Sequence, residues 1–166
     1  MRPATGPCRR YIRGMTRLAF LVLPVLLVAC NDPCKGGSNP SLELGMGWDR
    51  YNPVQPGDEV PLVYGQQGGF HVDLAVAATE FDATDVVSAS LSGSLDGVEV
   101  AAGQPWFELQ CDDTDQRLEG AGLRLVFFGV LPPDLDGQEV EVTATVRDSR
   151  NVEASAVQVY TVVDPN

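Results

Sequence analysis

The sequence predicts an all-β fold, an antiparallel β-sandwich of about eight or nine strands. Apolar and polar residues alternate with a period of two in several segments, as expected for strands with one buried and one solvated face. No stretch of roughly a dozen residues has the apolar spacing of a helix. These segments lie in residues 41–166, a length that suits one compact domain. The turn signals between them include Asp96-Gly97, a hairpin dipeptide, and Asp136-Gly137.

The clearest alternation lies in residues 138–147. One face of this segment is apolar, and the other carries glutamate, threonine and arginine. Residues 123–130 are apolar on both faces, which predicts a central strand covered on both sides. In residues 106–111 the apolar face is formed by Phe107, Leu109 and Cys111. Further strands are predicted at residues 70–78, 87–92, 98–100 and 157–163.

An apolar run of 12 residues, 18–29, lies near the start of the chain. It is too short to span a bilayer, which takes about 20 residues. Five basic residues and no acidic ones precede it, as in a secretory signal peptide. A start at Met15 gives a compact leader of the same kind. The basic residues are Arg2, Arg9, Arg10, Arg13 and Arg17.

The end of this run, Leu27-Val28-Ala29-Cys30, resembles the lipobox of bacterial lipoproteins. The resemblance implies that residues 1–29 are a cleaved signal peptide and that Cys30 carries fatty acyl chains such as palmitate. The mature chain is then anchored in a membrane of the cell envelope. Asn31 favours the outer over the inner membrane, because aspartate at this position favours inner-membrane retention in enteric bacteria. The alternatives are an ordinary secretory signal or a short anchor helix.

Residues 30–40 are rich in glycine, proline and asparagine, which predicts a flexible tether before the domain at 41–166. Beyond residue 29 the chain keeps six basic residues and all 23 acidic ones, a net charge of −17. Such a surface would repel nucleic-acid phosphates, so we expect no nucleic-acid partner. It would also be repelled by anionic headgroups, so the lipid on Cys30 must provide the anchoring. Acidic excess also keeps a domain soluble without any partner.

Two cysteines remain once Cys8 is assigned to the leader and Cys30 to the lipid. Cys34 and Cys111 form an even pair in an oxidising compartment, which predicts a disulfide. In the chain-entropy model it stabilises the fold by roughly 4 to 5 kcal/mol. A free thiol pair and a metal site are the alternatives. Zinc would need two further ligands, and the chain has one histidine, so we expect no metal or other cofactor.

The segment 139–148, followed by a turn and a closing strand, resembles the last hairpin of many bacterial immunoglobulin-like domains. The resemblance implies an immunoglobulin-like arrangement of the sandwich. The Cys…Trp…Cys signature of antibody domains is not convincingly present, because Trp48 lies much too near Cys34. The resemblance therefore concerns the architecture and not the antibody family.

The segment 65–71 is the most unusual part of the mature chain. Gly65, Gly68 and Gly69 suggest positive φ angles, and exposed amides there could hold an anion or a peptide. The segment does not match a phosphate-binding loop, and a wide turn feeding a strand is the plainer interpretation. His71 lies one pleat from Asp73, so the two could support acid–base chemistry. No Gly-x-Ser-x-Gly elbow accompanies them, which favours a solitary surface histidine.

Two further groups of side chains are candidates for binding. Acidic loops at predicted strand ends could bind calcium, but neither has EF-hand spacing, and ordinary solvated turns are the favoured interpretation. Exposed aromatic residues could form a platform for a glycan or peptide, or could pack in the core. The acidic residues are Asp112, Asp113, Asp115, Asp134 and Asp136, and the aromatic residues are Trp48, Tyr51, Tyr64 and Trp106.

These observations predict a non-enzymatic, membrane-anchored envelope lipoprotein that binds a protein or a polysaccharide. No catalytic residue is assigned, and the speculative binding residues are Gly65, Gly68, Gly69 and His71. One alternative is an accessory structural subunit of an envelope complex. A less favoured alternative is a lipid-anchored hydrolase that uses His71. The fold alone does not choose among them, because sandwiches serve many functions.

Overall fold

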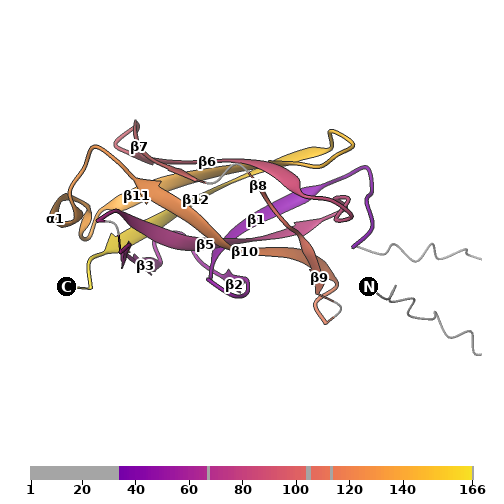
Figure 1. Cartoon of the computed structure of the whole chain (residues 1–166), viewed down its shortest axis with the longest axis horizontal. Coiled ribbons are helices and arrows are strands. Elements are labelled where there is room, and N and C mark those ends of the chain that lie inside the picture. The colour runs from indigo at the N-terminus through magenta and orange to yellow at the C-terminus, as the bar shows by residue number, and fades with distance from the viewer. Residues whose placement is uncertain (1–33, 67, 104–105, 113, 166) are drawn as a thin grey trace, which may run out of the picture. The chain divides into compact units, whose positions relative to one another are not determined.

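The computed structural model describes residues 34–165, except 67, 104–105 and 113 (Figure 1). The chain divides into two units, residues 1–30 and 31–166, and all described residues belong to the second. The predicted signal peptide, 1–29, and the lipid-bearing Cys30 therefore lie outside the described residues. Within the described ranges, no helix is long and apolar enough to cross a membrane.

The described part of the chain is almost entirely β-structure, with twelve strands and one short helix. Seven strands have six residues or more. The expected number of eight or nine strands therefore lies between the number of long strands and the total number. In chain order the elements are β1 (Ser41–Met46), β2 (Asn52–Pro53), β3 (Glu59–Pro61), β4 (Val63–Tyr64), β5 (Phe70–Thr79), β6 (Val87–Leu95), β7 (Val98–Gly103), β8 (Trp106–Phe107), β9 (Gln110–Asp112), β10 (Arg117–Phe127), α1 (Pro132–Leu135), β11 (Glu139–Arg147) and β12 (Glu153–Val163).

The strands wrap around one core, with β6 and β7 on one side and β5 on the other (Figure 1). The main strand order is β2-β1-β5-β10-β7-β6-β11-β12-β3, so both sides belong to one continuous sheet. Pairing of β10 with β7 joins the sides, and the buried hydroxyl of Tyr160 on β12 donates a hydrogen bond to the Gly45 carbonyl on β1 at 3.3 Å. The all-β, sandwich-like prediction is confirmed. The sheet is not purely antiparallel as expected, because β12 and β3 pair in parallel.

The alternation predicted for residues 138–147 is confirmed by β11. Its inward-facing side chains are almost completely buried, whereas Glu139 and Glu141 are exposed. Burial of each such valine stabilises the fold by roughly 1.5 to 3 kcal/mol. The Asp96-Gly97 hairpin is also confirmed, with both residues at positive φ between the paired ends of β6 and β7. The inward-facing residues of β11 are Val140, Val142, Ala144 and Val146.

Two strand predictions were wrong in part. Residues 123–130 do not form a strand covered on both sides, because Val126 is 45% exposed and Phe128 is also exposed. At this point only the inner face of the sheet packs against the core. Residues 106–111 form two short strands instead of one, because β8 pairs with β6 whereas β9 pairs with β10. Phe107 and Leu109 are buried as expected, but Cys111 is exposed.

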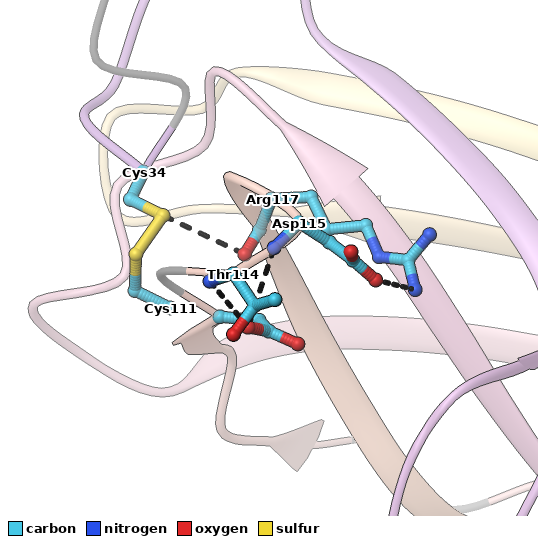
Figure 2. The surroundings of a disulfide bond; sticks show 6 residues. Cys34, Cys111, Thr114, Asp115 and Arg117 are labelled. Carbon is cyan, nitrogen blue, oxygen red and sulfur yellow. Dashed lines mark hydrogen bonds and ion pairs between the residues drawn. A yellow bond between two sulfur atoms is a disulfide. The ribbon is translucent and has the colours of Figure 1, made fainter.

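The predicted disulfide between Cys34 and Cys111 is present, with a Cα–Cα distance of 5.5 Å (Figure 2). It joins the segment before β1 to β9. The Gly37 amide donates to the Glu80 carbonyl at 2.8 Å, and the Asn39 amide donates to the Glu80 side chain at 2.7 Å. The described portion of the expected tether, 34–40, is therefore attached to the domain at several points.

Candidate functional site

A cavity of about 730 Å³ opens beside β4, β5 and β10. We call it the aromatic cleft. Its walls combine aromatic rings with a histidine, an aspartate and an arginine. The lining residues are Trp48, Val63, Tyr64, Gly65, Gln66, Gly69, Phe70, His71, Asp73, Arg124 and Val126.

Strand register brings residues that are distant in sequence to this cleft. His71 on β5 pairs with Val63 on β4 and with Val126 on β10, so it lies between two valines. Two residues further along β5, Asp73 pairs with Arg124 on β10. Because side chains alternate along a strand, His71 and Asp73 point to the same face of the sheet. The cleft therefore has a valine on each side of His71. A pair of opposite charges, Asp73 and Arg124, lies next to these residues along the same strands.

Glycines position Trp48 over β10. The register of β10 shifts between Gly120 and Leu123, where Gly122 has a φ of +69° and its amide donates to the Gly47 carbonyl at 3.0 Å. A Cβ atom on Gly122 would lie 2.9 Å from the Trp48 carbonyl oxygen. Only a residue without a side chain permits this approach without a shift of the loop. The loop thus holds the Trp48 side chain at the surface, where 59% of it is exposed.

Arg124 lies against Trp48, with its Cζ 5.0 Å from the centre of the indole ring. A cation in this position is attracted by the negative face of the ring. Arg117, Arg147 and Arg150 all form ion pairs with carboxylates, whereas no carboxylate of the described residues lies within 4.0 Å of the Arg124 guanidinium. Its N–H groups are therefore not committed to an ion pair with these residues. Arg124 was not among the site residues predicted from the sequence, although it is an arginine inside the otherwise apolar segment 123–130.

The expected proximity of His71 and Asp73 is present, with Nε2 of the histidine 3.3 Å from Oδ1 of the aspartate. The distance is that of an ion pair, but the orientation does not make a hydrogen bond. Oδ1 is buried and accepts no hydrogen bond from any described residue. The residues that line the cleft include no serine, threonine or cysteine that could act as a nucleophile beside this pair.

The glycine-rich segment forms a closed turn at the edge of the cleft. The Gly65 amide donates to the Gly69 carbonyl at 2.7 Å, and the Gly68 amide donates to the Gly65 carbonyl at 3.1 Å. These two amides are therefore engaged within the turn. Of the speculative binding residues, Gly65, Gly69 and His71 line the cleft, whereas Gly68 lies in the turn at a φ of +87° and is not part of the lining.

The structure separates the four aromatic residues that were considered as one platform. Trp48 and Tyr64 both line the cleft. Trp106 on β8 is 66% exposed but does not line it. Tyr51 is only 6% exposed and packs with Ala75 and Ala77. Burial, with the nearby Glu43 carboxylate as a further cause, raises the pKa of Tyr51, so this residue belongs to the packing and not to a binding surface.

The acidic loop after β9 brings carboxylate oxygens of Asp112, Asp115 and Glu119 within 4.8 Å of one another. Arg117 already occupies the cluster, since one of its nitrogens lies 3.0 Å from Asp115 (Figure 2) and 2.8 Å from Glu119. Hydrogen bonds from Thr114 hold the pKa of Asp112 below its usual value. The second acidic loop also serves a local contact, because Asp136 accepts a hydrogen bond from the Asp164 amide at 2.9 Å.

Comparison with known proteins assigns no family to the chain: no protein-family model matches it, and no curated protein sequence matches it. Function is therefore inferred from the leader and from the geometry of the cleft.

Proposed function

We propose that this protein is a non-enzymatic, lipid-anchored lipoprotein of the bacterial cell envelope, whose immunoglobulin-like sandwich binds a polysaccharide in the aromatic cleft. The observation that carries the proposal is the convergence of exposed Trp48 with Tyr64, His71 and Arg124. One face of a sugar ring presents C–H groups that pack on an aromatic surface, and the hydroxyl groups at its edge need charged or polar partners. The cleft offers both kinds of contact.

Its size favours a saccharide over a protein partner. A cavity of about 730 Å³ lies within the usual range for small ligands, roughly 300 to 1,000 Å³. A stable protein interface instead covers about 800 Å² on each partner, with a flatter apolar centre. The hydrolase alternative has less support, because the lining combines one histidine with no serine, threonine or cysteine that could act as a nucleophile.

Replacement of Trp48 by alanine should weaken polysaccharide binding by about tenfold or more, because an aromatic stacking surface contributes roughly 1 to 3 kcal/mol. The measurement is retention of the purified full-length protein on an array of bacterial and plant polysaccharides, followed by titration calorimetry with the polysaccharide retained. Trp106→Ala is the matched control, since that tryptophan is exposed outside the cleft. Failure to bind any polysaccharide, or an equal loss in both variants, would contradict the proposal.

The anchor rests on the lipobox-like sequence, and we place it in the outer membrane because Asn31 follows Cys30. The disulfide limits the distance between the domain and the membrane. Cys34 is only four residues beyond Cys30, and four residues span at most about 14 Å. A lipid on Cys30 would then keep the disulfide end of the domain close to the membrane surface.

Cys30→Ala should release the domain from the membrane fraction or leave the precursor uncleaved. The expected readouts are fractionation of cells and the intact mass of the purified protein, which should show acyl chains on the native chain alone. Cys8→Ala should leave both readouts unchanged, since Cys8 lies in the expected leader. Normal processing of the Cys30 variant with full membrane retention would argue against a lipid on this residue.

A further inference from the structure

A second cavity, of about 630 Å³, adjoins the aromatic cleft. Trp48 is the one residue that the linings of the two cavities have in common. The second cavity extends towards β9 and the disulfide, and includes Gln110 and Cys111. The two cavities together exceed the space that a single sugar unit would fill.

The second cavity is acidic. Its carboxylates are those of Asp49, Glu108, Asp112 and Glu119, and Arg50 is the one cation in its lining. Glu119 is neutralised by Arg117, which lies outside the lining at 2.8 Å, but Asp49 and Glu108 are exposed and have no such partner in the described ion pairs. A repeating negative charge on a ligand would meet like charges here and would be disfavoured.

The aromatic cleft has a different charge balance. Arg124 is the one arginine in the lining of the aromatic cleft, which contains no lysine. Asp73 pairs with Arg124 across the neighbouring strands. These two charges offset each other, and aromatic and aliphatic side chains form much of the remaining lining. Neither cavity therefore provides an excess of positive charge with which to hold an acidic polymer.

We propose that the two cavities form one groove, in which a linear oligosaccharide without carboxylate or sulfate groups lies across Trp48 with sugar units on both sides. This inference rests on the proposed function, and adds to it the length of the ligand, its charge class and a specificity role for Asp49 and Glu108. Occupation of the second cavity becomes intramolecular once the first is filled, so a longer chain binds more tightly than a single unit.

The test is calorimetry of the full-length protein with glucose oligomers of one to six units in β-1,4, β-1,3 and α-1,4 linkage, and with chito-oligosaccharides. For the bound series, affinity should rise at least tenfold from one unit to four and then level off. Trp48→Ala should abolish this dependence on length. If one unit binds as tightly as six while Trp48→Ala still weakens binding, the groove is refuted and the proposed function survives. If none of these oligosaccharides binds although a polysaccharide of the array is retained, the groove is refuted and the proposed function survives; if the array also retains none, both are refuted.

The charge class is tested with oligogalacturonides of matched length, which should bind at least tenfold more weakly than the neutral series. The double variant Asp49→Asn/Glu108→Gln should narrow this difference by raising the affinity for the oligogalacturonide. Glu99→Gln/Glu141→Gln removes the same charge from exposed residues outside both cavities and should not narrow it. Tighter binding of the oligogalacturonide to the native protein, or equal effects of the two double variants, would overturn the assignment of specificity.

Discussion

Replacement of both disulfide cysteines, Cys34→Ala/Cys111→Ala, should lower the free energy of unfolding by about 4 kcal/mol. The bond joins residues 77 positions apart, and its loss gives the unfolded chain the entropy of a long open loop. In the folded protein the bond attaches the segment that precedes β1 to strand β9, which has only three residues. We expect the largest local loosening at these two elements. Urea unfolding at pH 7 measures the difference in free energy.

A reducing agent provides the control for this prediction. Cys111 is exposed, so reduction of the native protein should bring its unfolding midpoint close to that of the double variant. The same treatment should leave the double variant unchanged. A loss below about 1 kcal/mol would contradict the prediction, because it would mean that the unfolded chain gains little entropy when the bond is removed.

The strands that could be predicted are those whose burial is decided locally. In β11 every second residue is apolar and buried, because one face of the strand lies on the core. The same alternation in Leu42, Leu44 and Met46 was available to predict β1, which the sequence analysis did not assign. The division of residues 106–111 could not be predicted, since it depends on β8 and β9 pairing with different neighbours. Such a choice is made by tertiary contacts.

The candidate site was predictable only where its residues are close in sequence. His71 and Asp73 are two residues apart on one strand, and this spacing predicts their shared face. The pairing of Asp73 with Arg124 depends on the register between β5 and β10, which includes a shift at Gly120. The position of Trp48 depends on a glycine in that same shifted region. A one-residue slip would reverse the face of each side chain, so the full cleft required the structure.

Asp148 stabilises the turn between β11 and β12 through hydrogen bonds that the sequence analysis did not anticipate. Its side chain is 0% exposed. It accepts backbone N–H bonds from Asp82, Arg150 and Val152 at 2.9 to 3.0 Å, and the guanidinium of Arg150 lies 2.8 Å from Oδ2. Asp148→Asn should lower the free energy of unfolding by about 3 kcal/mol at pH 7, because an amide group would place a donor against these donors and would lose the ion pair.

This stabilisation should depend on pH in a defined direction. Burial alone would raise the pKa of Asp148, but the hydrogen bonds from Asp82, Arg150 and Val152 outweigh it and hold the pKa below its ordinary value of 3.8. A lowered pKa in the folded state means that the contribution is complete above about pH 4 and declines as the pH falls through the folded value. The difference in unfolding free energy between the native protein and Asp148→Asn should therefore shrink between pH 7 and pH 3.

Glu153→Gln is the matched control for this effect, since Glu153 pairs with Arg147 on the surface of the same hairpin. An exposed pair of this kind contributes less than about 1 kcal/mol, so the variant should unfold almost as the native protein does. Urea titrations at both pH values compare the three proteins. A difference for Asp148→Asn that stays the same at pH 3 would show that its cost comes from shape and packing. A difference that disappears at pH 3 would show that the cost comes from the loss of the buried carboxylate charge. The partners of this carboxylate are backbone N–H groups and the Arg150 guanidinium, all within the turn and the loop after β5.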